Sequence, residues 1–340
     1  MKVVFFTRKL DKDDPRIGFA HLWAKELAKR LEKVHVVCLG VGRVELPDNV
    51  EVHPLGKGRL RRFLRYQWLM LRLGKRVDAI FCHMNPIYAI ISAPMAKLYR
   101  KRLVMWYAHG GISWRLKLAI RLCDRILTSS KSGLRIETKK ARVVGQGIDT
   151  ERFKPAGVGR GMLSVGRISR VKGYETLIKA LPGILAELPK TELRIVGGAE
   201  LEDEKAYLKE LAALSKELKV DKSLEFVDGI SFEEMPKVYS NCKLFVSDSQ
   251  TGSLDKVVLE AMSSGRLVLT SNPGFRDILK EFGGMMMFRK RDEKEFCEKA
   301  IVLLSLDEKA RERASRRLRE IVASEHSLGS LMDRIVKSLY

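Results

Sequence analysis

Short apolar runs alternate along the chain with longer segments in which apolar residues recur every three or four positions. In the first half we expect strands at 2–7, 34–39, 78–82, 103–107 and 125–128, and helices at 18–31, 60–73, 86–99 and 113–122. In the second half we expect strands at 162–165, 192–196, 224–227, 243–247 and 267–270, and helices at 174–187, 202–218, 232–239, 256–263, 274–280, 293–304 and 307–322. This alternation predicts an α/β protein with parallel sheets.

The two series are joined by a stretch that contains Gly and Pro, residues 153–161, and 340 residues suffice for two hydrophobic cores. We therefore expect two doubly wound, Rossmann-like domains, residues 1–155 and 156–326. Apolar residues at helical spacing predict a last helix within 327–340. The first strand is followed by no GxGxxG motif, so the dinucleotide-binding fingerprint is missing.

A glycine and two cations follow the strand at 162–165. Gly166, Arg167 and Lys172 stand between this strand and the helix that begins at Tyr174. Backbone amides at a helix N-terminus attract anions, and the two cations would add positive charge for a diphosphate. The alternative is an ordinary β–α turn with solvated cations.

Glu260 is the second candidate, because it lies inside an apolar helical segment next to Leu259 and Ala261. A carboxylate in such surroundings needs a polar partner. A pair of ribose hydroxyls would be suitable. The alternative is an ion pair on the helix surface with Lys256, four residues earlier.

Together these segments resemble the retaining glycosyltransferases of the group 1, or family four, type, which have the GT-B fold. Residues 147–155 match an interdomain GID-x-x-x-F-x-P signature, and 166–173 match a phosphate-binding stretch. Residues 259–265 match the second half of a paired-glutamate motif, and 123–130 resemble the strand before the interdomain segment. The four segments occur in the family's order, and the resemblance covers nearly the whole chain.

The resemblance implies two domains facing a cleft, with the helix in 327–340 returning to the first domain. It implies transfer of a sugar from a UDP- or GDP-linked donor with retention at the anomeric carbon and without a metal ion or other cofactor. Arg167 and Lys172 would then stabilise the diphosphate, and Glu260 would hold the ribose. Further donor contacts are expected from residues near the domain faces and from the loop before the glutamate helix: Gly18, Gly166, Ser253, Leu254, Asp255 and Lys256.

One position departs from the family's pattern. The first glutamate of the paired motif, which touches the transferred sugar in the family, would stand eight residues before Glu260, where this chain has Gly252. Backbone amides of this loop, or Asp255, are then left to replace that contact.

Histidine and carboxylate residues supply further candidates. His109 follows the strand at 103–107, and the family has a catalytic histidine at a similar place; the alternative is a cap in a glycine turn. Asp11 and Asp13 form a DxD sequence, but it comes too early for the metal motif of the other glycosyltransferase fold. The remaining histidines form no cluster along the sequence and are not expected to bind metal: His21, His35, His53, His83 and His326.

Composition favours a cytoplasmic protein. Five widely spaced cysteines fit no CxxC zinc pattern and are expected to be reduced core thiols. No uncharged run reaches the roughly 18 residues of a membrane span, and the chain starts on a strand, so we expect no signal peptide. Docking on the inner face of the cell membrane stays open at this point.

The net charge of +22 is unevenly distributed. Residues 1–155 hold 33 Lys and Arg against 13 Asp and Glu, a net of +20, whereas the remainder holds 31 against 29. Residues 57–76 carry eight cations and no acid, interleaved with Leu, Phe, Tyr and Trp. Such a helix suits an anionic membrane surface, and the alternative is a sheet-covering helix with a solvated basic edge. Nucleic acid is not expected, because no basic–aromatic repeat or helix-turn-helix spacing is present.

Three functions remain open on sequence alone. The first is a retaining sugar transferase with a lipid-linked or other membrane-surface acceptor. The second is the same chemistry on a soluble acceptor. The third is a non-catalytic protein that binds a nucleotide-sugar or nucleic acid on this fold, as Gly252 and the basic first half would suggest.

Overall fold

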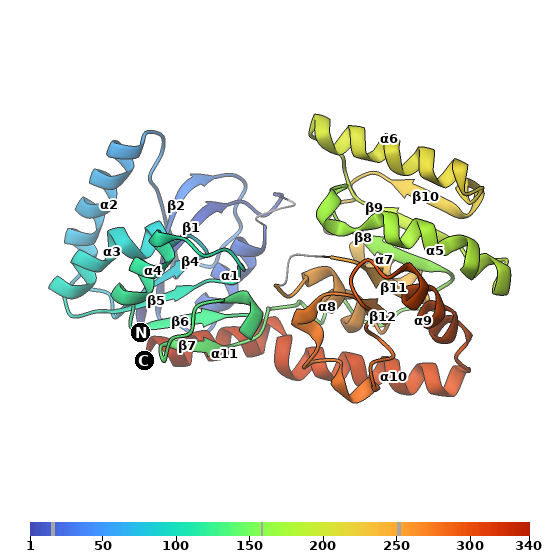
Figure 1. The fold of residues 1–340 in the computed structure, drawn as a ribbon. Helices are drawn as coiled ribbons and strands as arrows, with labels where there is room; N and C mark the ends of the chain where they lie inside the picture. The colour runs from blue at the N-terminus through green and yellow to red at the C-terminus, as the bar shows by residue number, and fades with distance from the viewer. Residues whose placement is uncertain (15–17, 158, 250–252) are drawn as a thin grey trace. The chain divides into compact units, whose positions relative to one another are not determined.

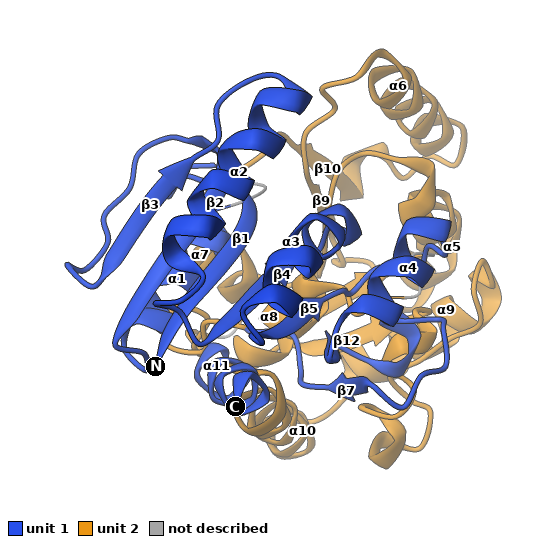
Figure 2. Cartoon of the chain, turned by 90° about the vertical axis from the view of Figure 1, so that its left-hand side faces the viewer, with its two compact units in different colours: residues 1–147, 328–340 blue, residues 148–327 orange. Residues whose placement is uncertain are grey.

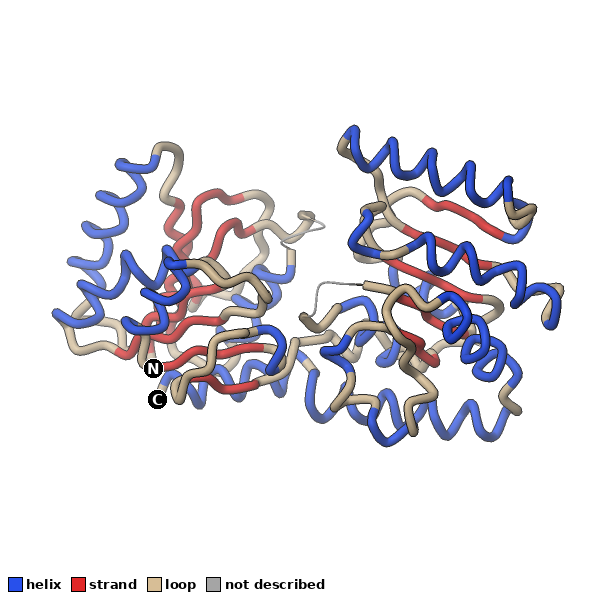
Figure 3. Tube along the Cα trace, in the orientation of Figure 1, coloured by secondary structure: helices blue, strands red, loops and turns tan. Residues whose placement is uncertain are grey.

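The computed structural model describes residues 1–14, 18–157, 159–249 and 253–340. It divides into two compact units, residues 1–147 with 328–340 and residues 148–327 (Figure 2). Residues 148–155, which we expected in the first domain, belong to the second unit, because Ile148 and Phe153 pack in its hydrophobic core. In each unit, parallel strands are covered by helices (Figure 3).

The described residues of the first unit contain a seven-stranded parallel sheet with the order β3-β2-β1-β4-β5-β6-β7 (Figure 1). Its strands are β1 (Lys2–Leu10), β2 (Lys33–Val41), β3 (Val50–Pro54), β4 (Ala79–His83), β5 (Arg102–Trp106), β6 (Arg125–Thr128) and β7 (Ala141–Val143). Its α-helices are α1 (Phe19–Ala28), α2 (Arg59–Leu73), α3 (Pro86–Leu98), α4 (Trp114–Leu122) and α11 (Leu328–Leu339).

Alternation along β1 supplies two cores, one on each face of this sheet. Val3 and Phe5 pack in a cluster with residues of α1 and α11, whereas Val4 and Phe6 pack with residues of α2, α3 and α4. This is the period-two pattern of a strand that is buried on both faces. The terminal helix α11 therefore completes the first unit.

The second unit, over its described residues, contains a five-stranded parallel sheet with the order β10-β9-β8-β11-β12. Its strands are β8 (Met162–Val165), β9 (Leu193–Val196), β10 (Leu224–Val227), β11 (Leu244–Ser247) and β12 (Leu267–Thr270). Its α-helices are α5 (Tyr174–Glu187), α6 (Glu202–Glu217), α7 (Met235–Ser240), α8 (Lys256–Ser263), α9 (Glu293–Ser305) and α10 (Glu308–Ile321). The direction in which strands are added reverses between β8 and β11.

Each predicted strand is present, and the helices are confirmed except one. The helix expected at 274–280 is wrong: two 3-10 turns, Pro273–Phe275 and Lys280–Phe282, occupy that region. Pro273 and Gly274 open the segment and Gly283 and Gly284 close it, so an α-helix has little length to propagate. Two strands were missed, β3 and β7, because β7 has only three residues and β3 contains His and Pro.

No helix in the described parts of the chain is long and apolar enough to cross a membrane.

Candidate functional site

The point at which the strand order reverses lies between β8 and β11 in the second unit. In open parallel sheets, ligands bind beyond the carboxyl ends of the strands at such a point. Residues 166–173 follow β8, and residues 248–255 follow β11. The two stretches singled out from the sequence therefore leave the two strands that flank this point.

Gly166 allows a close approach of backbone and side chains directly after β8. It has a φ of +152°, and a Cβ placed there would lie 3.0 Å from Cε of Lys172 and 3.3 Å from the hydroxyl of Tyr174. The Tyr174 hydroxyl donates to the Gly166 carbonyl at 2.7 Å. Only glycine fits this position without displacing Lys172, so the turn keeps the lysine folded back over its own strand end.

Lys172 joins the β8 loop to the β11 loop. Its Nζ lies 3.5 Å from Oδ1 of Asp255, and the two side chains are only 18% and 10% exposed. Oδ2 of Asp255 accepts from Nδ2 of Asn272 at 3.1 Å, and the same amide donates to the carbonyl of Ser253 at 2.7 Å. Asn272 follows β12, so the loops after three strands converge on Asp255.

Asp248 holds the start of α5 by accepting a hydrogen bond from its first turn. It is fully buried, and the hydroxyls of Thr176 and Ser271 each donate to its carboxylate at 2.6 Å. A Cβ at Gly173, which has a φ of +60°, would lie 2.5 Å from Asp248 Oδ2. Burial raises the pKa of Asp248, and these hydrogen bonds oppose the rise. The carboxylate is therefore a structural acceptor beneath the turn that precedes α5.

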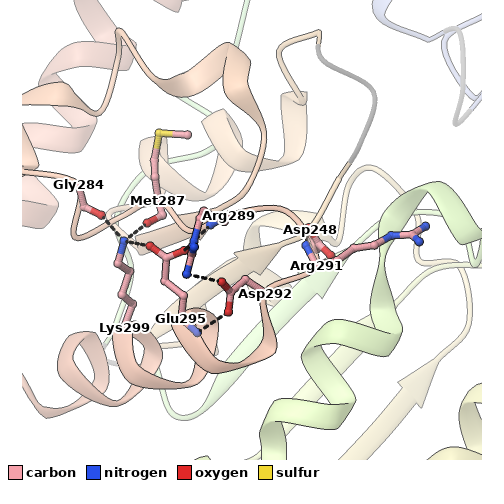
Figure 4. Close-up of polar contacts among 8 residues, drawn as sticks. All are labelled: Asp248, Gly284, Met287, Arg289, Arg291, Asp292, Glu295 and Lys299. Carbon is pink, nitrogen blue, oxygen red and sulfur yellow. Dashed lines mark hydrogen bonds and ion pairs between the residues drawn. The ribbon is translucent and has the colours of Figure 1, made fainter.

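A fourth loop also reaches Asp248, through the backbone amide of Arg291, which donates to Oδ1 at 3.4 Å (Figure 4). The Arg291 side chain extends away from the neighbouring charged cluster at the start of α9. In that cluster Glu295 accepts from Lys299 Nζ at 2.7 Å and from Arg289 Nε at 3.0 Å. The hydrogen bond from Lys299, reinforced by Arg289, lowers the pKa of Glu295 to about 2.

Glu260 is buried on α8, and its partner is one that the sequence did not indicate. The hydroxyl of Tyr239, on α7, donates to Glu260 Oε2 at 2.8 Å, and Tyr239 has no solvent exposure. Burial raises the pKa of Glu260, which the Tyr239 hydrogen bond and the nearby charge of Lys256 counteract. Burial likewise lowers the pKa of Lys256. Lys256, the surface partner that we considered for Glu260, is half-buried and acts on Glu260 through its nearby charge.

Arg167 is placed differently from Lys172. Its guanidinium lies 3.2 Å from Oε1 of Glu204, with Arg167 60% exposed and Glu204 7% exposed. Oε2 of Glu204 accepts the backbone amides of Glu200 and Leu201 at the start of α6. Among the two predicted phosphate cations, Lys172 is thus the one that joins the β11 loop, and Arg167 extends along the outer side of the β8 loop.

The loop before α8 is only partly described. Leu254 is buried, and Ser253 is held by Asn272 through its carbonyl. Gly252, which stands at the place of the family's first glutamate, lies outside the described residues. Within the described part, Gly166, Lys172, Ser253, Asp255 and Glu260 come from loops and a helix that leave the switch-point strands.

His109 and Gly18 belong to the first unit, where both follow strands of the seven-stranded sheet. His109 is exposed in the loop after β5, and its Nδ1 accepts from the backbone amide of Gly111 at 3.0 Å. Gly18 precedes α1 and donates to the carbonyl of Asp14 at 2.8 Å, an approach that a side chain at Gly18 would obstruct. The glycine-turn cap that we considered for His109 is present, and it uses Nδ1 of the ring.

The DxD carboxylates after β1 are ion-paired. Asp11 lies 2.9 Å from Nζ of Lys9, and Asp13 lies 2.8 Å from Nε of Arg43. The expectation that the histidines do not gather is wrong, because Nδ1 of His35 lies 3.2 Å from Nε2 of His53. Adjacent strands β2 and β3 bring together residues that are 18 positions apart in the sequence.

Helix α2 buries one narrow side, and most of its remaining side chains are exposed. Tyr66, Met70 and Leu73 are buried. Five large apolar residues of the same helix are exposed: Leu60 (71%), Phe63 (43%), Leu64 (57%), Trp68 (57%) and Leu71 (54%). The guanidinium of Arg72 lies over the Trp68 ring, 4.5 Å from its centre. Exposed apolar side chains beside cations on one helix are the pattern of an interaction surface.

Three residues that organise the second-unit site were missed from the sequence. Asp248 stands at the end of a buried strand, and Asn272 follows the next strand just before Pro273, positions where polar side chains meet at the carboxyl edge of a sheet. A polar residue at the end of a predicted strand could therefore have identified Asp248 and Asn272 as candidates from the sequence. Tyr239 gave none, because its contact with Glu260 depends on how α7 packs on α8.

Comparison with known proteins agrees with this geometry. The model of the family described as glycosyl transferases group 1 matches residues 150–320, half of the chain. Among solved structures, Anabaena HepE in complex with UDP has a TM-score of 0.80 over 100% of this chain and 99% of its own, at 18% identity. That likeness confirms the expected fold class of two doubly wound α/β domains.

Curated relatives match a shorter part of the chain. Spore coat protein SA of Bacillus subtilis is 29% identical over 203 residues, 52% of this chain and 52% of its own. A GDP-mannose-dependent alpha-(1-6)-phosphatidylinositol monomannoside mannosyltransferase of Mycolicibacterium smegmatis is 29% identical over 148 residues, 38% of this chain and 37% of its own. The match thus spans about half or less of these relatives' length. Since the family model spans the two switch-point loops and the Glu260 helix, the chain belongs to the group 1 glycosyl transferases.

Proposed function

We propose that this protein is a retaining glycosyltransferase that takes a sugar from a nucleoside-diphosphate donor. The observation that carries the proposal is the Lys172–Asp255 contact, which joins the two family loops at the switch point of the second sheet. A transferase of this kind must stabilise a diphosphate leaving group and a positively charged sugar in the transition state. Fixed donors and cations at that position supply such stabilisation.

In the proposed donor complex, the diphosphate lies against the starts of α5 and α8, whose first backbone amides lack intrahelical acceptors. Lys172 neutralises charge on the leaving group and exchanges its contact with Asp255 for one with phosphate. Arg167 turns from Glu204 to the outer phosphate oxygens, which its 60% exposure permits. These cations take the place that a metal ion has in other transferases, so we propose that transfer needs no metal.

Glu260 is proposed to accept the ribose hydroxyls of the donor. Its buried carboxylate is oriented by Tyr239, and it lies on the helix that begins at the Asp255 loop. In the first unit, His109 is proposed to contact the sugar or the phosphate, and Gly18 to leave room for the donor. The donor nucleotide is proposed to be UDP or GDP; the HepE structure contains UDP, and the mycobacterial relative is named for GDP-mannose.

The acceptor is proposed to be lipid-linked or otherwise held at an anionic membrane surface. The support is α2, with five exposed large apolar residues and no acidic residue between Glu51 and Asp78. The name of the mycobacterial relative contains phosphatidylinositol monomannoside, a lipid-linked sugar. Each basic residue near an anionic surface adds about 1 kcal/mol of attraction, so the cations of residues 57–76 suffice for reversible docking.

The donor proposal is tested with purified full-length chain. We expect one or more nucleoside diphosphates of a panel that includes UDP and GDP to raise the midpoint of thermal unfolding. The corresponding nucleotide-sugars should then release nucleoside diphosphate, by transfer or slow hydrolysis. Binding without release on any acceptor would support the non-catalytic alternative. A panel in which nothing binds would contradict the donor site itself.

The membrane proposal is tested separately by liposome flotation. The chain should float with anionic vesicles at low salt, remain in solution with zwitterionic ones, and be released by high salt. Replacing the exposed Arg59 and Arg61 by Ser should reduce flotation, whereas the same change at the exposed Arg313 and Arg316 of α10 should not. Arg62 and Arg65 are less suitable, because they also donate to the carbonyls of Gly56 and Leu55. Absence of flotation with either vesicle would favour a soluble acceptor.

A further inference from the structure

Three polar side chains from two neighbouring strands meet on one face of the first sheet. His35 lies on β2, and Glu51 and His53 lie on β3, where Glu51 is the direct register partner of His35. Their neighbours Val34, Val36 and Val52 pack in the core with α1 and α11. By strand alternation the three polar side chains therefore point to the opposite face, the one that α2 covers.

The ligand atoms of these residues lie close together in all three pairs. Nδ1 of His35 is 3.2 Å from Nε2 of His53 and 3.4 Å from Oε2 of Glu51. Nε2 of His53 is 3.6 Å from Oε1 of Glu51. Ligands that stand about 2.0–2.1 Å from a tetrahedral Zn²⁺ ion are separated by roughly 3.3–3.5 Å from one another. The two ring nitrogens each face a different oxygen of Glu51, and one ligand atom from each of the three residues lies within 4.8 Å of the others. A small rotation of the exposed Glu51 carboxylate would bring one oxygen to tetrahedral spacing from both nitrogens.

The two imidazoles suit this role chemically. His35 and His53 are mostly buried, with side chains 8% and 18% exposed. A neutral imidazole nitrogen is a common ligand of transition metals. Without a metal, the close pair of ring nitrogens can share a single N–H···N hydrogen bond. That hydrogen bond is the alternative explanation, and it accounts for the two histidines but not for Glu51.

We propose that His35, Glu51 and His53 bind one divalent transition-metal ion of the Zn²⁺ class. Two histidines and a carboxylate form a familiar three-residue ligand set for zinc. The fourth position opens into a cavity of about 500 Å³ that these residues line together with Trp68, Leu69 and Leu73 of α2. The ion would cross-link the edge strand, β3, to β2. It would thereby stabilise the face of the sheet on which α2 packs.

The charges around the site oppose a cation and set its affinity. Lys2, Lys33, Arg72 and Arg76 also line the cavity, against Glu32 and Glu51. Nζ of Lys33 is 3.7 Å from Oε2 of Glu51, and it competes directly with a metal for that carboxylate. Glu51 is also 51% exposed, so binding must order it. An anion or hydroxide in the open fourth position would offset this positive surrounding.

The site is independent of the proposed transfer reaction, so its test does not use activity. Full-length chain without a polyhistidine tag, freed of metal by a chelator, is titrated with Zn²⁺ in a calorimeter and with Co²⁺ by visible absorption. We expect one high-affinity equivalent, the ligand-field bands of four-coordinate Co²⁺, and a higher midpoint of thermal unfolding with Zn²⁺.

Variants at Glu51 and His53, which are more exposed than His35, decide the assignment. Glu51→Gln and His53→Ala should each weaken binding by at least about 100-fold, since even outer-shell partners of a metal contribute 10–100-fold. Lys33→Met should tighten binding, because it removes the competitor of the metal for Glu51. His109→Ala, which removes an exposed histidine elsewhere in the unit, should leave binding unchanged.

Two results would overturn the proposal. One is the absence of Zn²⁺ heat and of Co²⁺ bands at millimolar metal in the folded wild-type chain. The other is wild-type affinity in both Glu51→Gln and His53→Ala, which would place the bound metal elsewhere. Neither test depends on His35→Ala, whose loss from the buried middle of β2 could unfold the sheet edge.

Discussion

The two units share one fold class but keep their polar residues in opposite surroundings. In the second unit, the residues around the switch point are buried and bonded to one another: Lys172 with Asp255, Asp248 with Thr176 and Ser271, and Glu260 with Tyr239. In the first unit, the most polar helix, α2, exposes its cations together with large apolar side chains. The charge follows the same division: the first unit holds 33 Lys and Arg against 12 Asp and Glu, a net of +21, and the second holds 31 against 30.

This difference predicts which property a substitution in each unit should change. A buried, bonded polar group leaves its partner unsatisfied when it is removed, at a cost of roughly 1–3 kcal/mol per group. An exposed charge acts mainly through long-range attraction and is weakened by salt. We therefore expect changes in the second unit to affect chemistry, donor binding and stability, and changes on α2 to affect partition to a surface.

The largest effect is expected from Lys172→Ala. Loss of the cation at the leaving group should lower kcat/KM by roughly 100- to 1,000-fold, or about 3–4 kcal/mol, as for the loss of one oxyanion donor. Steady-state kinetics with the donor found by the panel measure it. Lys179→Ala is the matched control, since this α5 lysine is 47% exposed and pairs with Glu293. Equal kcat/KM for both variants would remove Lys172 from the mechanism.

Asp248→Ala should be the most destabilising change at the site. It leaves the buried hydroxyls of Thr176 and Ser271 without their acceptor and should lower the free energy of unfolding by about 3 kcal/mol. Urea unfolding monitored by circular dichroism measures it. Glu293→Ala, which breaks only an exposed ion pair, should cost less than about 1 kcal/mol. A similar loss in both variants would contradict the anchoring role of Asp248.

The outline of both units could be predicted from sequence because parallel strands are continuous apolar runs and the covering helices are amphipathic. Gly166, Lys172 and Asp255 follow predicted strands, and the structure shows that those strands, β8 and β11, flank the switch point. The features that could not be predicted depend on contacts between segments that are distant in the sequence. Tyr239 meets Glu260 only through the packing of α7 on α8, and His35 meets His53 only through the register of β2 with β3.

The sequence also could not distinguish the side-chain directions of the two predicted phosphate cations. Arg167 and Lys172 look equivalent in the motif, but the turn folds Lys172 over Gly166 toward Asp255 and directs Arg167 to Glu204. A turn with a positive-φ glycine at each end decides this, and side-chain direction within such a turn is not encoded in spacing alone.

Glu260→Ala should weaken nucleoside-diphosphate binding by about 1.5–3 kcal/mol, the loss of hydrogen bonds to a charged group. The thermal shift produced by the diphosphate should then largely disappear, while the variant alone still unfolds cooperatively. The exposed Glu187→Ala serves as control for the removal of one acidic residue. An unaltered thermal shift in Glu260→Ala would mean that this carboxylate only supports the packing of Tyr239.

Glu295 should give the second unit an acid-sensitive contribution of about 1 kcal/mol, small because the pair is partly exposed. Its pKa is about 2 in the folded chain against an ordinary value of 4.5, so the contribution is present above pH 4.5 and is lost as pH falls toward 2. Comparing urea unfolding of wild type and Glu295→Gln across that window measures it. The stability difference between them should shrink with acid; a difference that stays constant would contradict the pairing with Lys299.

The smallest expected effect is that of chelation on transfer. If Lys172, Arg167 and the helix amides carry the diphosphate, EDTA should leave kcat/KM unchanged, measured well below the unfolding midpoint. The same chelator should lower the unfolding midpoint of wild type but not of His53→Ala, because only wild type would lose a bound metal from the first unit. Activity that disappears with EDTA and returns with Mn²⁺ or Mg²⁺ in both proteins would instead assign a metal to the donor site. That result would make the paired Asp11 and Asp13 the first residues to test. The metal site proposed at His35, Glu51 and His53 would still be decided separately by the Zn²⁺ and Co²⁺ titrations.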